Sequence, residues 1–100
     1  MKIQIDGRDY TISYNIAAYE QAEKMAGVSI MSEIINKEGM IALTPLKIIM
    51  GCGLLNEDGN RLSPEHGQKA AVEYIQENGY GNTVALVFER IQEDMGFLFR

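Results

Sequence analysis

The sequence is poor in cysteine, proline and tryptophan, and it holds fewer basic than acidic residues. Its 100 residues include one cysteine, two prolines and no tryptophan. A single cysteine excludes an intramolecular disulfide, which favours the reducing cytoplasm as the place where the chain folds. The 9 basic and 14 acidic residues give a formal net charge of -5, and the basic residues form no cluster. Binding to a nucleic-acid backbone is therefore disfavoured, because counterion release requires several clustered cations.

The chain also lacks the segments that direct a protein to or across a membrane. No apolar run approaches the roughly 18 to 20 residues needed to span a bilayer, and no basic segment followed by an apolar stretch opens the sequence. Its 46% hydrophobic content is enough for one core, and 100 residues are too few for two independent domains. We therefore expect residues 1–100 to form a single cytoplasmic domain with no membrane partner.

The first residues have the pattern of a β-hairpin. Apolar residues alternate with polar ones on both sides of Asp6-Gly7, a dipeptide that supplies the positive φ angles of a tight two-residue turn. One face of this hairpin is apolar, so it must pack on the helical remainder or on another subunit, because an isolated hairpin is only marginally stable. The predicted pairs are Ile5 with Arg8, Ile3 with Tyr10 and Met1 with Ile12.

The rest of the sequence predicts helices. Residues 44–55 are apolar on nearly all sides, so we expect this helix at the centre of the core, with Gly51 and Gly53 marking a close contact or a bend. The fold class is α+β, with an N-terminal two-stranded β-hairpin packed on a bundle of about four to five short helices. The predicted helices are 16–26 between Asn15 and Gly27, 30–37 before Gly39, 44–55 begun by Thr44-Pro45, 64–78 begun by Ser63-Pro64, and one capped by Asn82 that ends near Gly96.

No set of residues has the spacing of a catalytic or metal site. His66 is the one histidine, and its place in the first turn of a predicted helix makes it solvent-facing. Cys52 lies among apolar residues without a basic neighbour in sequence, and such a thiol has a raised pKa and low reactivity. Gly51-Cys52-Gly53 lacks the lysine of a phosphate loop, and Asp58-Gly59 lacks the further oxygen ligands of a calcium loop. We expect no enzyme, no cofactor and no metal.

The six methionines and an apolar run near the end of the sequence remain to be explained. Methionine fills irregular gaps in a core, and it also gives adaptable contact with a partner's apolar segment. The run Phe97-Leu98-Phe99 is costly to expose unless it packs back or docks on another protein. The candidate protein-binding residues are Met95, Phe97, Leu98 and Phe99.

The order of these segments resembles that of the small tail assembly chaperones of long-tailed bacteriophages, and the resemblance covers most of the chain. In those proteins a strand, Asp-Gly and a second strand, as in residues 2–10, lead into a helix like residues 18–27. A later helix of small and aliphatic residues, like Leu46 to Leu55, precedes an acidic loop and a segment like Leu62-Ser63-Pro64-Glu65.

The resemblance implies a non-enzymatic phage or prophage protein that keeps the tape measure protein in solution while tail-tube subunits assemble around it. Its expected partners are the tape measure protein and the major tail tube protein, and its expected location is the host cytoplasm, not the mature virion. Methionines and the Phe-Leu-Phe run suit an apolar client, and acidic charge adds attraction to a basic one. The edge of the hairpin is a candidate site for self-association.

Two other classes stay open. A small structural component of the tail or head-tail junction would remain in purified virions. An acidic phage-encoded inhibitor of a host nucleic-acid-binding protein would cluster its carboxylates on one face at duplex-like spacing, whereas here they are scattered among the predicted helices. An enzyme would require His66 beside Cys52 in a cleft.

Overall fold

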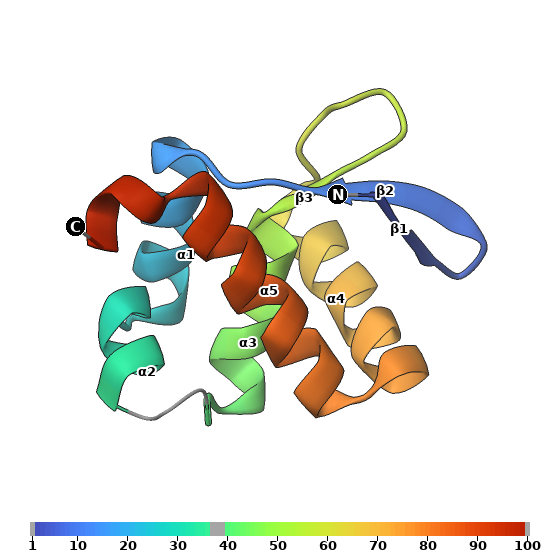
Figure 1. The fold of residues 1–100 in the computed structure, drawn as a ribbon. Helices are drawn as coiled ribbons and strands as arrows, with labels where there is room; N and C mark the ends of the chain where they lie inside the picture. Colours follow the sequence, from blue (N-terminus) through green and yellow to red (C-terminus); the bar gives the residue numbers. More distant parts are fainter. Residues whose placement is uncertain (1, 37–39, 100) are drawn as a thin grey trace.

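A short β-sheet packs against a group of helices, as Figure 1 shows. The computed structural model describes residues 2–36 and 40–99, and within them it confirms the predicted α+β class with five α-helices. In chain order the elements are β1 (Lys2–Ile5), β2 (Arg8–Ile12), α1 (Ile16–Ala26), α2 (Ile30–Asn36), α3 (Leu43–Cys52), β3 (Leu54–Leu55), α4 (Pro64–Asn78), α5 (Tyr80–Asp94) and the 3-10 helix η1 (Gly96–Phe99).

The hairpin has the register that its sequence predicts. β1 and β2 are antiparallel, with Ile3 opposite Tyr10 and Ile5 opposite Arg8. Asp6 and Gly7 have φ angles of 50° and 75°, the left-handed values that a tight two-residue turn requires. The predicted pair of Met1 with Ile12 lies outside the described residues.

Local capping signals also give the correct bounds of α1 and α4. The Asn15 side chain accepts a hydrogen bond of 2.8 Å from the backbone N–H of Ala18, and Gly27 closes α1 with a φ of 68°. Ser63 accepts a bond of 3.3 Å from the backbone N–H of His66 at the start of α4. For α2, the predicted end at residue 37 and the predicted stop at Gly39 lie outside the residues that the structure describes.

The predicted helix over residues 44–55 is wrong at both ends. α3 begins at Leu43, where the Leu46 N–H bonds to the Ala42 carbonyl, and Pro45 still falls in the first turn, whose N–H groups have no partner within the helix. The helix stops at Cys52, and Leu54–Leu55 instead form β3, which pairs with β2. The hairpin thus gains a two-residue third strand and becomes a sheet of order β1-β2-β3.

The start of α5 differs from its prediction as well. The helix begins at Tyr80, directly after Gly79, so Asn82 lies within it and is not its cap. Gly79 has a φ of 91° and turns the chain sharply, which joins α4 to α5 through one residue. The Thr83 hydroxyl donates 2.7 Å to the Gly79 carbonyl, and the Tyr80 hydroxyl donates to the carbonyl of Ile41, ahead of α3.

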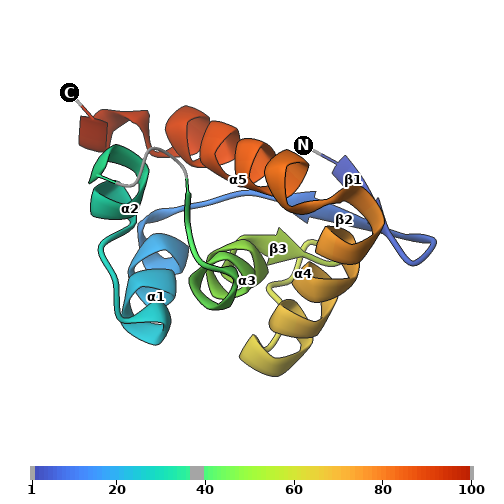
Figure 2. The same cartoon turned by 90° about the horizontal axis from the view of Figure 1, so that it is seen from below.

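α3 occupies the centre of the helical layer, with α1 on one side and α4 on the other (Figure 2). Leu46, Ile49 and Met50 on α3 have no exposed surface, and the apolar face of the hairpin packs into the same core. α3 and α4 cross closely, because a Cβ on Gly51 would lie 2.7 Å from the carbonyl carbon of Gly67. Over residues 2–36 and 40–99, no helix has both the length and the apolar content to cross a membrane.

Candidate functional site

The candidate binding residues divide between the core and the surface. Met95 follows α5 and is 1% exposed, at the end of an inward stripe that contains Val87 and Ile91. Met95 therefore extends the inward-facing stripe, whose members recur every three or four residues, and it packs in the core. Met95 is a packing residue, and this corrects its place in the predicted binding surface.

Phe97 and Leu98, in contrast, are accessible. They belong to η1, and their side chains are 49% and 37% exposed. The Leu98 N–H bonds to the Met95 carbonyl at 2.9 Å, so the turn that presents both side chains is anchored to a buried residue. The side chain of Phe99 lies outside the described part of the chain. We call Phe97 and Leu98 the 97–98 surface.

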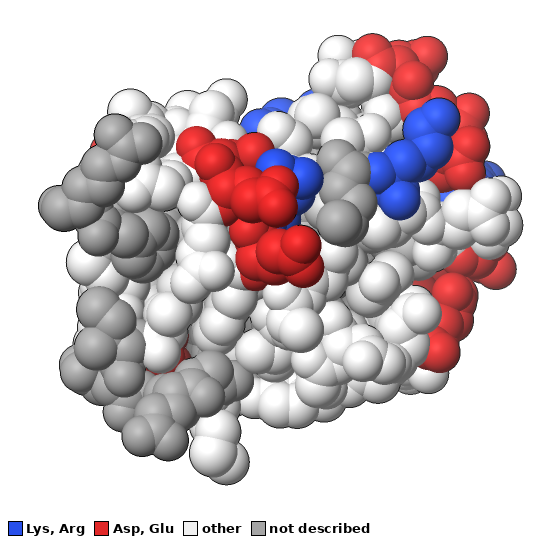
Figure 3. Space-filling model, in the orientation of Figure 1, with Lys and Arg blue, Asp and Glu red and all other residues white. Residues whose placement is uncertain are grey.

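The 97–98 surface lies at the end of the molecule opposite the hairpin. In Figures 1 and 2, η1 is on the left, at the same end of the molecule as α1 and α2, and the tip of the hairpin is on the right. In the view of Figure 3 the described side chains at this end are mostly uncharged, whereas acidic groups gather along α5 and around the hairpin. Ile16, at the start of α1, is also 56% exposed.

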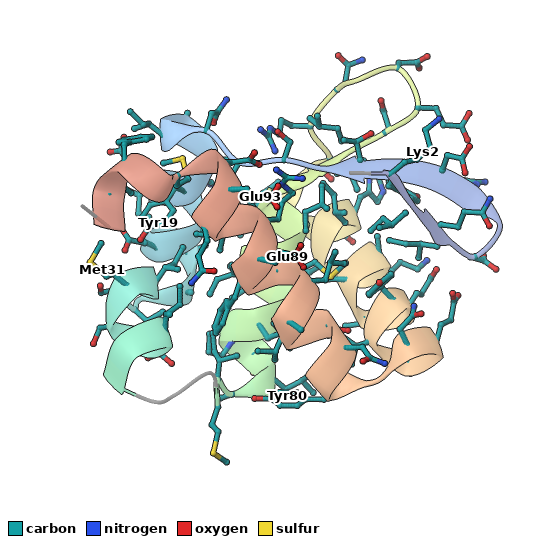
Figure 4. All side chains as sticks on the ribbon, in the orientation of Figure 1. Lys2, Tyr19, Met31, Tyr80, Glu89 and Glu93 are labelled. Carbon is teal, nitrogen blue, oxygen red and sulfur yellow. The ribbon has the colours of Figure 1, made fainter. Side chains whose placement is uncertain are left out.

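Asp94 fixes the end of α5 just before this surface. Its carboxylate accepts a bond of 2.9 Å from the backbone N–H of Tyr14, in the segment that joins β2 to α1. Arg90 donates to the same carboxylate at 3.0 and 3.2 Å and to Glu93 at 2.6 Å. Figure 4 shows the neighbouring Glu89 and Glu93 on α5. These contacts hold the end of α5, which η1 follows, against the segment before α1.

Potentially reactive side chains occupy structural positions. Cys52 ends α3 with its Sγ 3.9 Å from the Sδ of Met25; burial raises the pKa of its thiol, and Arg61 partly opposes this shift. His66 is exposed on the first turn of α4. In the described parts of the chain, no three His, Cys, Asp or Glu side chains are grouped so that they could hold a metal ion.

A groove that sequence analysis missed lies between the hairpin, the loop after β3 and α4. We call this feature, of about 690 Å³, the hairpin groove. Its apolar lining is Ile5, Tyr10, Leu62 and Ala70, and its charged or ionisable lining is Asp6, Arg8, Asp9, Glu57, Asp58, His66, Lys69 and Glu73. These residues come from segments far apart in sequence, so the groove could not be predicted before the fold was known.

No protein-family model matches the chain, and comparisons with curated proteins and with solved structures give no significant match. The resemblance to tail assembly chaperones therefore stays a prediction that rests on the sequence.

Proposed function

We propose that this protein is a non-enzymatic tail assembly chaperone of a long-tailed phage or prophage. It binds the tape measure protein in the host cytoplasm, assists assembly of the tail tube protein around it, and is not part of the mature virion. The observation that carries the proposal is the exposure of Phe97 and Leu98, at 49% and 37%, on a turn that is hydrogen-bonded to the carbonyl of the buried Met95. The resemblance in segment order is the second support.

The 97–98 surface suits a client whose apolar residues vary along its length. Two large apolar side chains offer non-directional contact, which tolerates different partners better than a set of hydrogen bonds does. Burying the exposed part of each side chain contributes on the order of 1 kcal/mol. Such a weak contact suits a client that must later be released to the tail tube.

Co-expression with the tape measure protein of the same phage tests both the function and the site. We expect the soluble fraction of the tape measure protein to rise severalfold with the wild-type chain and to fall back with the double variant Phe97→Ser/Leu98→Ser. The matched control is Met40→Ser/Leu43→Ser, because these apolar side chains are also exposed, at 77% and 53%, and belong to a different segment. Circular dichroism checks that each variant is folded.

The outcomes separate the function from the site. Unchanged solubility of the tape measure protein with the wild-type chain contradicts the chaperone function. Full rescue by the Phe97→Ser/Leu98→Ser variant contradicts the 97–98 surface alone. Mass spectrometry of purified virions tests the structural alternative, because a tail or head-tail junction component would be present there in stoichiometric amount.

A further inference from the structure

The hairpin groove carries a surplus of negative charge. Its lining contains five carboxylates against the two permanent cations Arg8 and Lys69. Among the residues that the structure describes, no salt bridge joins a carboxylate of the groove to a lysine or an arginine, so none of these carboxylates is neutralised by a paired cation. The carboxylates are Asp6, Asp9, Glu57, Asp58 and Glu73. A groove with this lining attracts a cationic ligand.

The groove also has apolar lining and fixed walls. Ile5 and Ala70 are 1% and 7% exposed, and Tyr10 and Leu62 are half-buried beside them. The Asp6 N–H bonds to the Glu77 carboxylate at 3.2 Å, which ties the tip of the hairpin to the end of α4. One wall is thus held to the other without a ligand, so little ordering is needed when a ligand enters.

We propose that the hairpin groove binds a basic amphipathic segment of a partner protein. The apolar side of such a segment would contact Tyr10 and Leu62, and its Lys or Arg side chains would reach the surrounding carboxylates. Nucleic acid is disfavoured by the same negative charge. A metal ion is a poor occupant, since no metal-binding group of three acidic, Cys or His side chains exists within the described residues.

This second surface does not depend on the tail-assembly proposal, because it lies at the opposite end of the molecule from η1 (Figures 1 and 2). The protein would then have two separate binding surfaces: the 97–98 surface for apolar segments, and the acidic hairpin groove for basic ones.

A synthetic Leu–Lys peptide of about 14 residues, patterned as an amphipathic helix, is the probe. Fluorescence anisotropy measures its Kd for the intact protein, and ¹⁵N chemical shifts locate its site. We expect shifts at Tyr10, Leu62 and Ala70, and much weaker binding when Glu replaces Lys or Ser replaces Leu in the peptide. Raising the ionic strength should weaken binding, since the carboxylates are reached from solvent.

The protein variants are matched in charge. Glu57→Gln/Glu73→Gln removes two charges from the groove, and Glu20→Gln/Glu89→Gln removes two from α1 and α5. We expect the first to raise Kd by about three- to tenfold and the second by less than about twofold. Equal increases in Kd for the two variants, or chemical-shift changes centred on Phe97 and Leu98, would overturn the proposal that the peptide binds in the hairpin groove. These outcomes leave the tape measure assay unaffected, so the two proposals fail independently.

Discussion

Tyr14 joins three parts of the fold through three different groups. Its hydroxyl donates 2.7 Å to the Ile49 carbonyl, its backbone N–H donates to Asp94, and its ring covers Gly53, where a Cβ would overlap it. The last carbonyls of a helix have no partner within the helix. At the end of α3, Tyr14 supplies one of the missing donors, and Arg61 supplies another by bonding to the Cys52 carbonyl at 3.2 Å.

We expect Tyr14→Phe to lower the free energy of unfolding by about 1–2 kcal/mol, because the buried Ile49 carbonyl loses its donor. Burial also raises the pKa of Tyr14 above its ordinary value of 10.0. The unfolded chain therefore releases this proton near pH 10 while the folded chain retains it, so stability is fully present below pH 10 and falls as pH rises beyond it. The variant should show a smaller alkaline loss.

Urea unfolding at neutral pH and near pH 11 measures both effects of Tyr14→Phe. The control is Tyr10→Phe, since the Tyr10 hydroxyl makes no hydrogen bond to any residue that the structure describes. Equal losses of stability in the two variants would show that the Tyr14 hydroxyl contributes nothing specific.

At the scale of the elements, α3 and α4 can cross closely because Gly51 and Gly67, which face each other at the crossing, have no side chains. We expect Gly51→Ala to lower the free energy of unfolding by about 1–3 kcal/mol, because its Cβ would overlap the backbone of Gly67. Gly81→Ala in α5 is the matched control, with no atom within 4 Å of the added Cβ. It should be neutral or stabilising by up to about 1 kcal/mol. Denaturant midpoints that shift equally would contradict the close crossing.

The elements that sequence predicted correctly have local signals. Asp6-Gly7 fixes a turn, and Asn15 and Ser63 cap helices through bonds to residues three positions away. β3 has no such signal: Leu54–Leu55 continue an apolar run that suits a helix, and only pairing with β2 makes them a strand. Sequence periodicity likewise placed Met95 on the inward stripe, but its apolar character alone did not separate a core residue from a binding residue.

The candidate sites show the same limit at the scale of the whole molecule. Sequence identified Phe97 and Leu98 because an apolar run is visible without a fold. It could not identify the hairpin groove, whose lining comes from β1, β2, the loop after β3 and α4. β1 lies at the edge of the sheet, as a self-association site requires, and that role stays a prediction.

At the scale of the whole molecule, Asp94 connects the end of α5 to the segment before α1, because its carboxylate accepts a hydrogen bond from the N–H of Tyr14, 80 positions earlier in the chain. We expect Asp94→Asn to lower the free energy of unfolding by about 1–3 kcal/mol, because the charged partner of both Tyr14 and Arg90 is lost. The control is Glu93→Gln, whose side chain is 56% exposed, and its effect should stay below about 1 kcal/mol. Hydrogen exchange adds a local readout: the Tyr14 amide should exchange faster in Asp94→Asn than in Glu93→Gln. Equal protection of that amide in both variants would mean that core packing, and not the Asp94 carboxylate, holds the end of α5 against the segment before α1.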